Sequence, residues 1–262
     1  MVEGILVVTA VGLVAGVLLV VASKFMYVPV DETAEKIRAC LPGANCGACG
    51  FAGCDGYAAA LAKRDGSVKP NLCTPGGAAA AQGICEVLDI PFEGVQAQKS
   101  VVKCTGTFDT SEYSMDYEGP KTCKACSTFY NGRRSCTYGC LGYGDCVEVC
   151  KFGALSIQNG LAVVDRELCT GCGACAKICP NHLFEMAPEN SRVWVGCASH
   201  DKGGVVRKIC SVGCIGCMKC QKTCQYGAIT VTENLAHIDP EKCTSCGECV
   251  EVCPVHVIHM VQ

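Results

Sequence analysis

Aromatic residues are scarce in this sequence. They make up 6% of the 262 residues, with a single tryptophan, whereas glycine occurs 30 times. This balance suits loops wrapped closely around inorganic groups better than a domain built on a large side-chain core. The net charge of −3 gives no indication of nucleic-acid binding.

Enzymatic signatures are missing as well. The sequence contains no Walker loop, no HExxH and no GxSxG motif. Trp194 and the five histidines belong to no pattern that indicates a site. We therefore expect no catalytic residue and no nicotinamide site on this chain.

Cysteine is the residue in excess, with 27 copies. A disulfide framework is one interpretation, but such frameworks are usually small and secreted, and an odd count leaves one thiol over. Most neighbouring cysteines here are separated by only two or three residues. That regular short spacing favours metal binding in a reducing compartment.

The N-terminus is apolar and uncharged over residues 4–22, about the length that crosses a bilayer. A signal peptide would need a basic start, and the chain begins with Met-Val-Glu. Lys24, Lys36 and Arg38 follow the apolar stretch, which predicts that the rest of the chain lies on the cytoplasmic side. The expected location is the cytoplasmic membrane, with a single span.

An α+β fold is expected after this segment. Asp31 to Cys40 and two later stretches predict helices, and residues 103–262 predict short strands joined by tight turns. The expected divisions are a transmembrane anchor at 1–25, an N-terminal 4Fe–4S module at 31–90, a linker at 91–102, and two tandem bacterial two-cluster ferredoxin-like units at 103–187 and 188–262.

The two units form an internal repeat with a period of 74 residues. Nine cysteines recur at that offset: Cys123, Cys136, Cys140, Cys146, Cys150, Cys169, Cys172, Cys175 and Cys179 correspond to Cys197, Cys210, Cys214, Cys220, Cys224, Cys243, Cys246, Cys249 and Cys253. Cys217 has no counterpart, because Tyr143 stands in its place. Asn159-Gly160 predicts a hairpin between two strands of the first copy.

The second copy has the spacing of a bacterial two-cluster ferredoxin, in which the fourth cysteine of each run binds the other cluster. Zinc is the alternative for paired C-x2-C motifs, but two consecutive runs spaced two, two and three favour iron–sulfur. The expected ligand sets are Cys214, Cys217, Cys220 and Cys253 for one 4Fe–4S cluster, and Cys243, Cys246, Cys249 and Cys224 for the other.

The first copy yields one complete set by the same rule and one incomplete set. Cys169, Cys172, Cys175 and Cys150 form the complete set, and Cys140, Cys146 and Cys179 lack a fourth ligand. A separate glycine-rich pattern near the N-terminus, Cys46, Cys49, Cys54 and Cys73, indicates a further four-iron cluster.

Eight cysteines remain after these assignments. Cys123, Cys136, Cys197 and Cys210 supply two thiols in each half, which suits a cluster that bridges the repeats. Cys104 then completes the Cys140 set, although an exchange of Cys104 with Cys136 or Cys123 stays open. This arrangement predicts six clusters on 24 cysteines and leaves Cys40, Cys85 and Cys126 spare.

The apolar N-terminus, the segment LPGANCGACGFAGC and the run CLGYGDCVEVCKFGAL together resemble the B subunit of the Rnf complex, over essentially the whole chain. The resemblance implies a membrane complex that oxidises reduced ferredoxin, reduces NAD and pumps sodium ions or protons. The B subunit would be its electron-entry subunit, with soluble ferredoxin and other Rnf subunits as partners and the flavin sites elsewhere.

Two alternatives belong to other classes. A relay subunit of a membrane hydrogenase or formate dehydrogenase would share the ferredoxin runs and lack the GANCGACG segment. An assembly or zinc-storage protein would carry no redox-active chromophore.

Overall fold

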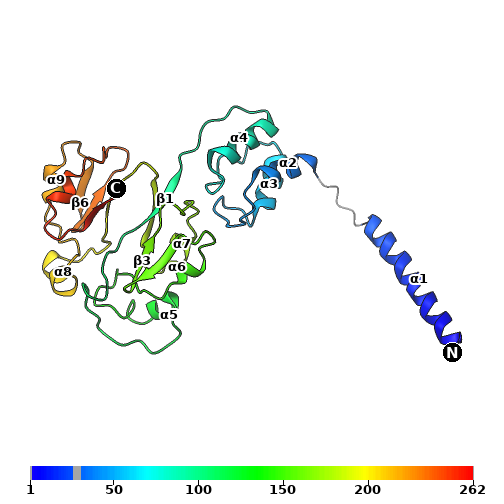
Figure 1. The fold of residues 1–262 in the computed structure, drawn as a ribbon, viewed down its shortest axis with the longest axis horizontal. Coiled ribbons are helices and arrows are strands. Elements are labelled where there is room, and N and C mark those ends of the chain that lie inside the picture. Colours follow the sequence, from blue (N-terminus) through cyan, green and yellow to red (C-terminus); the bar gives the residue numbers. More distant parts are fainter. Residues whose placement is uncertain (1, 26–30, 262) are drawn as a thin grey trace.

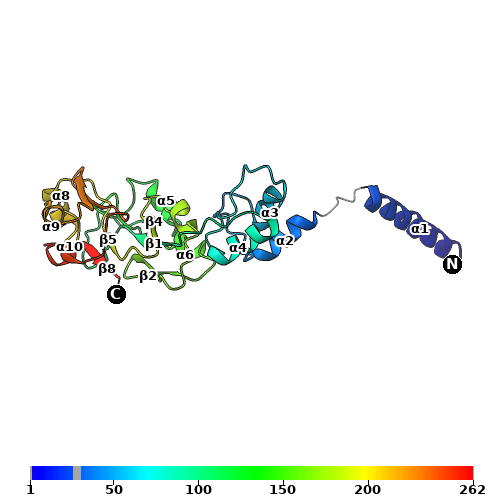
Figure 2. The ribbon, with the colours of Figure 1, turned by 90° about the horizontal axis from the view of Figure 1, so that it is seen from above.

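The computed structural model describes residues 2–25 and 31–261, without the side chains of residues 2–8 and 25. A helical module and two ferredoxin units follow one another along the long axis (Figures 1 and 2). The first helix, α1, spans Val2–Phe25 and contains the range expected to cross a membrane. Among the residues that are described, no helix meets both the length and the apolar character needed to cross a membrane.

The N-terminal module consists of three helices, α2 (Glu32–Cys40), α3 (Cys54–Ala62) and α4 (Gly77–Leu88). Asp31 begins α2 as its N-cap, because its side chain accepts a hydrogen bond from the Thr33 amide. The helices meet through Ile37, Tyr57 and Ile84, all of which are almost fully buried. The helical prediction for this region is confirmed, and the cysteine-rich loop lies between α2 and α3.

The first ferredoxin unit is built from two small antiparallel sheets and three short helices. Its elements are β1 (Gln98–Val102), α5 (Cys123–Ser127), α6 (Asp145–Glu148), β2 (Leu155–Gln158), β3 (Leu161–Val164), α7 (Ala174–Ile178) and β4 (Phe184–Pro188). β2 pairs with β3 around Asn159 and Gly160, both with positive φ, which confirms the predicted hairpin.

The range 91–102, expected to be a linker, contains a strand in the structure. β1 pairs with β4 along its whole length, and Ser100, Val101 and Val102 are buried there. Two adjacent valines and a small serine fill the space beside the cysteine loops, so the unit begins earlier than residue 103. The sequence showed no period because this strand is buried on both faces.

The second unit repeats this arrangement with β5 (Val193–Val195), α8 (Gly203–Ile209), α9 (Lys219–Thr223), β6 (Ile229–Thr232), β7 (Leu235–Ile238), α10 (Glu248–Glu251) and β8 (Ile258–Met260). β6 pairs with β7 and β5 pairs with β8, both antiparallel. The core of this unit mixes strand residues with cysteines, as in the first unit.

The strand register identifies a different first-unit counterpart for Cys197 than the 74-residue offset does. Val102 faces Phe184 across the first sheet, and Val195 faces Ile258 across the corresponding sheet. Cys104 and Cys197 each lie two residues after those valines and are therefore structural equivalents. The expected pairing of Cys123 with Cys197 is wrong, because Cys123 belongs to an insertion between β1 and Cys136.

Candidate metal centres

Four cavities in the ferredoxin units are each lined by four cysteines. We name each cavity after its place or after one of its lining residues. The junction cavity, between the two units, is lined by Cys104, Cys136, Cys197 and Cys210, and the Cys123 cavity is lined by Cys123, Cys140, Cys146 and Cys179. The Ser100 cavity is lined by Cys150, Cys169, Cys172 and Cys175, and the Val193 cavity by Cys224, Cys243, Cys246 and Cys249. In the last two cavities the structure brings together the cysteines that were grouped from spacing.

In two further groups the thiols lie close to one another but do not line a cavity of this kind. Cys46, Cys49, Cys54 and Cys73 form the N-terminal set, and Cys214, Cys217, Cys220 and Cys253 form the Cys217 set. Burial raises the pKa of Cys73, and the other three thiols of its set add to the effect. Burial likewise raises the pKa of Cys220 to about 11, with a further contribution from the three thiols around it.

Cys123 reaches its cavity because Asp145 holds the start of α5. The Asp145 carboxylate accepts hydrogen bonds from the amides of Cys123, at 2.7 Å, and Lys124, at 3.0 Å. Asp145 lies two residues after Tyr143, so this contact places α5 against the loop in which the fourth cysteine is missing. A thiol from the insertion thereby joins Cys140 and Cys146.

The Tyr143 side chain lies outside the lining of the Cys123 cavity. Its ring packs with Cys126 and Leu141, and the Arg133 guanidinium lies 4.6 Å from the ring centroid. Cys104, expected to be the missing ligand, lines the junction cavity instead. Its sulfur accepts a long hydrogen bond of 3.5 Å from the Cys140 amide, so it contacts the neighbouring loop from the other side.

Burial opposes ionisation of several of the cavity thiols. Burial raises the pKa of Cys146 and of Cys197 to about 12, and that of Cys140 to about 11. A coordinated metal removes the proton from a thiol outright. Four thiols around one apolar cavity, at least one of them buried in every case, are a donor set that fits an iron–sulfur cluster.

A site for a single metal ion needs its ligands closer together than a cluster site does. Within the part of the chain that the structure describes, no three or more His, Cys, Asp or Glu side chains form a group that could hold one metal ion.

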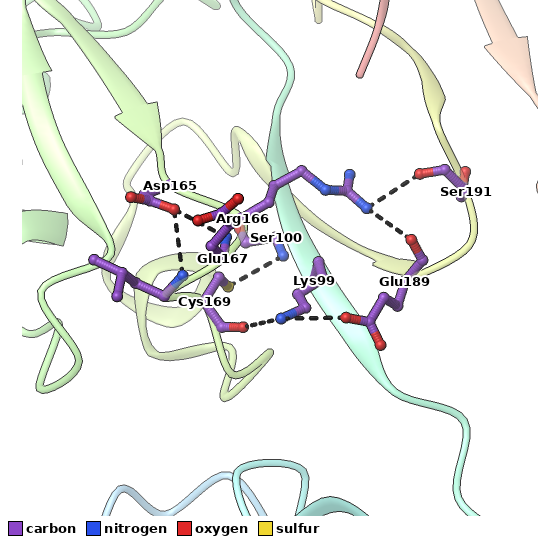
Figure 3. A network of polar contacts seen from close by, with 9 residues as sticks. Lys99, Ser100, Asp165, Arg166, Glu167, Cys169, Glu189 and Ser191 are labelled. Carbon is purple, nitrogen blue, oxygen red and sulfur yellow. Dashed lines mark hydrogen bonds and ion pairs between the residues drawn. The ribbon is translucent and has the colours of Figure 1, made fainter. Parts of the chain in front are cut away.

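Ser100 contacts two of the four sulfur atoms of the Ser100 cavity, and Figure 3 shows the contact to Cys169. Its amide donates to Cys169 Sγ at 3.4 Å, and its hydroxyl lies 3.5 Å from Cys175 Sγ. Lys99 fixes this register, since its ammonium donates to the Cys169 carbonyl at 2.8 Å and pairs with Glu189 at 3.4 Å. Hydrogen bonds to cluster sulfurs raise the reduction potential of a cluster.

The N-terminal module docks on the first unit through two lysines. Lys151 donates to the carbonyls of Ala44 and Asn45, at 2.8 and 3.2 Å, and Lys177 donates to the Gly47 carbonyl at 3.2 Å. These carbonyls belong to the loop that carries Cys46. The contacts therefore set the N-terminal set beside the Ser100 cavity.

The six groups of cysteines follow one another in a single line. The Cys140 amide donates to Cys104 Sγ, and in the other neighbouring groups burial raises the pKa of one thiol and the charge of another thiol raises it further. These pairs are Cys46 with Cys172, Cys175 with Cys146, Cys214 with Cys197, and Cys220 with Cys249. The order is the N-terminal set, the Ser100 cavity, the Cys123 cavity, the junction cavity, the Cys217 set and the Val193 cavity. It agrees with the elongated arrangement in Figures 1 and 2.

Comparisons with known proteins indicate iron–sulfur domains in this chain. Family models described as a putative Fe-S cluster, a 4Fe-4S binding domain and a 4Fe-4S dicluster domain match residues 41–75, 162–184 and 213–257. The chain is 43% identical to the B subunit of the ion-translocating oxidoreductase complex of Methanosarcina acetivorans, over 99% of this chain and 98% of the relative. The chain belongs to this family of B subunits.

Two further members of the family are named for their electron partners. The B subunit of the Na(+)-translocating ferredoxin:NAD(+) oxidoreductase complex of Acetobacterium woodii is 40% identical over 94% of this chain and 74% of its own length. The proton-translocating counterpart from Clostridium ljungdahlii is 40% identical over 98% of this chain and 91% of its own. These relatives favour the Rnf interpretation over a relay subunit of a hydrogenase or formate dehydrogenase.

The family models do not cover two parts of the chain that the structure makes important. Residues 76–161 and 185–212 lie outside every match, yet they contain all four cysteines of the junction cavity. Sequence reasoning also missed Ser100 and Arg134, which lines the junction cavity, because neither residue type belongs to a cysteine motif. The only sequence signal for Ser100 was its place in a short valine-containing stretch.

Proposed function

We propose that this chain is the electron-entry subunit of an ion-pumping ferredoxin:NAD oxidoreductase. It accepts electrons from reduced ferredoxin and passes them to membrane partners. The observation that carries this proposal is the single line of six cysteine groups from one end of the redox body to the other. When bound, iron–sulfur clusters supply one-electron transfer.

The proposed ligands are the four cavity sets and the two further sets described above, giving six 4Fe–4S clusters on 24 cysteines. The chain's own residues orient these thiols and shield most of them from water. Asp145 positions Cys123, the strand β1 positions Cys104, and the hairpins close over the loops. Cys40, Cys85 and Cys126 remain outside every set.

The far end of the second unit is the proposed entry for ferredoxin. Cys217 and Cys246 are exposed there, so the sites that they would help to hold lie close to the surface. Lys219 and Lys222 lie on α9 beside Cys220 and are exposed. Their positive charge suits an acidic electron carrier, because complementary charge steers the encounter of two proteins.

The N-terminal end is the proposed exit toward the membrane. The N-terminal set lies on the module that follows α1, and α1 is the proposed anchor, with the redox body on the cytoplasmic side. The name "ion-translocating" of the relatives supports a membrane partner for this end. The other Rnf subunits are expected to carry the flavin and nicotinamide chemistry.

An assay with the full chain alone tests this function. Purified anaerobically with its iron, the chain is expected to oxidise reduced ferredoxin stoichiometrically and not to reduce NAD, because no group in the sequence indicates hydride transfer. Optical bleaching of the brown chromophore measures the first reaction, and NADH absorbance measures the second. Steady NAD reduction by the lone chain would contradict the proposal.

A further inference from the structure

A buried arginine lies at the boundary between the two ferredoxin units. Arg134 is 2% exposed and lines the junction cavity together with Cys104, Cys136, Cys197 and Cys210. Its two terminal nitrogens donate to neutral acceptors, namely the carbonyls of Gly106 and Gly160, both at 2.9 Å, and the Ser111 hydroxyl.

Among the residues that the structure describes, no carboxylate forms an ion pair with Arg134. The Arg134 Nε is a buried donor that has no hydrogen-bond partner in that part of the chain. Lys103, the other cation on the cavity, pairs with Glu185 at 3.5 Å. The Tyr113 ring faces the guanidinium, whose carbon lies 5.1 Å from the ring centroid, but a ring carries no net charge. A buried cation without a counter-anion is costly, because burial removes the water that solvated it. The geometry calls for an anion in this cavity.

The cavity is assembled from both units and from the insertion. The Ser211 amide donates to the Thr110 carbonyl and the Glu112 amide donates to the Ile209 carbonyl, both at 2.9 Å. These main-chain bonds hold the insertion against the end of α8, next to Cys210. The four thiols are thus fixed by the packing of the two units on each other.

We propose that Cys104, Cys136, Cys197 and Cys210 hold a four-iron cluster at this junction, and that Arg134 is its buried counter-charge. The inference rests on the proposed function and deepens it by naming the site that joins the two units. Reduction adds one electron, supplied by reduced ferredoxin, and no bond forms or breaks. The added negative charge is stabilised by the guanidinium, so Arg134 raises the reduction potential of this cluster.

Of the two repeat-related positions beside Cys136 and Cys210, only the one in the first unit carries a buried cation. Lys208 stands 74 residues after Arg134, at the corresponding place in the second unit, and it is exposed. An exposed ammonium is screened by water and has little effect on a buried group. The structure therefore gives one buried cation to the cluster between the units and none from the equivalent position.

A redox titration of the full chain, followed by electron paramagnetic resonance, tests this role. Arg134→Gln is expected to keep all iron and to lower the midpoint potential of one cluster, while Arg134→Lys restores the potential toward that of the unchanged protein. Arg133→Gln is the matched control, since Arg133 stacks on Tyr143 and is absent from the junction cavity. Unchanged potentials in an iron-replete Arg134→Gln protein would overturn the counter-charge.

A second variant tests the site itself. Cys136→Ala is expected to lose the iron of one cluster, about four atoms per chain, or to retain a three-iron remnant with its own signal. If Arg134→Gln also loses iron, the missing signal must be the one that Cys136→Ala removes; loss of a different signal would refute the proposal. Full iron in Cys136→Ala would overturn the junction cluster, whereas failure of the unchanged chain to oxidise reduced ferredoxin would overturn the proposed function.

Discussion

Tyr143 shows how one residue change redirects a ligand set. A phenol is a poor substitute for a thiolate at a soft iron–sulfur site, and the ring instead packs with Arg133 and Cys126. The place of the missing thiol is approached by α5, whose first residue is Cys123. The proposed fourth ligand, Cys123, comes from an insertion, and the Asp145 carboxylate fixes the start of its helix.

We predict that Cys123→Ala loses about four iron atoms per chain, because the Cys123 cavity then has three thiols. Adding Tyr143→Cys is expected to restore them, since Cys217 has this position in the second copy. Iron analysis and paramagnetic resonance measure both effects. Cys126→Ala is the control: Cys126 is 0% exposed but lines no cavity described above, so its variant is expected to keep its iron.

A second prediction at this scale concerns Ser100. Ser100→Ala removes the hydroxyl contact to Cys175 and is expected to lower the midpoint potential of the cluster at the Ser100 cavity, because a donor to a sulfur atom is lost. Val193 lines the equivalent cavity of the second unit and has no hydroxyl. Val193→Ser is therefore expected to raise the potential of the other cluster, and unchanged values in both titrations would contradict this explanation.

At the scale of elements, short strands and helices act as holders for loops. The helices that begin at or beside cysteine loops, α6, α7, α9 and α10, are four or five residues long. Such helices have little stability of their own, because forming the first turn is costly. Their geometry depends on packing against the sheets and on the groups that the cysteines bind.

We predict that the contact between the N-terminal module and the first unit depends on two lysines. Lys151→Met with Lys177→Met removes hydrogen bonds to three loop carbonyls and is expected to cost about 1 kcal/mol, the low end for exposed bonds. Hydrogen exchange of residues 43–50 should accelerate about fivefold, with iron unchanged. Lys208→Met, an exposed lysine on α8, is the control; equal acceleration in both proteins would argue against specific docking.

At the scale of the whole molecule, the described residues form several small cores around the cysteine groups instead of one continuous hydrophobic core. The buried residues divide into separate clusters, and cysteines belong to each of them. Sheets of only two strands are marginal without further packing. The clusters of buried residues therefore depend on what the cysteines hold.

We predict that removal of iron unfolds the two ferredoxin units, because the binding energy of a structural metal site is folding energy. Anaerobic chelation should abolish hydrogen-exchange protection in β1 to β8. The N-terminal helices have a side-chain core of Ile37, Tyr57 and Ile84, so they should retain more hydrogen-exchange protection than the strands. Protection of the strands at native levels in iron-free protein would show that the side chains alone suffice.

The proposed anchor is also testable at this scale. Deletion of residues 1–25 is expected to leave a brown protein in the soluble fraction, because the apolar stretch 4–22 is removed. Fractionation and absorbance measure the result. A truncated chain that stays in the membrane fraction without other subunits would refute the anchor, and the intact chain expressed in parallel is the control.

The sequence by itself determined the motif-based cysteine groups, the helical N-terminal module and the strand–turn–strand hairpins. Those features depend on local spacing: a C-x2-C-x2-C run brings its own thiols together, and Asn159-Gly160 fixes its own turn. The strand β1 could not be predicted from the sequence, because a short strand that is buried on both faces shows no hydrophobic period. Ser100 and Arg134 could not be predicted as site residues, because they belong to no motif.

Only the tertiary structure decided which distant thiols share a cavity. Cys104 and Cys123 both stand outside the runs, and spacing left their exchange open. The register of β1 against β4 places Cys104 at the junction, and the Asp145 carboxylate places Cys123 beside Tyr143. The order of the six groups was also set at this level, since contacts between units depend on packing rather than on position along the chain.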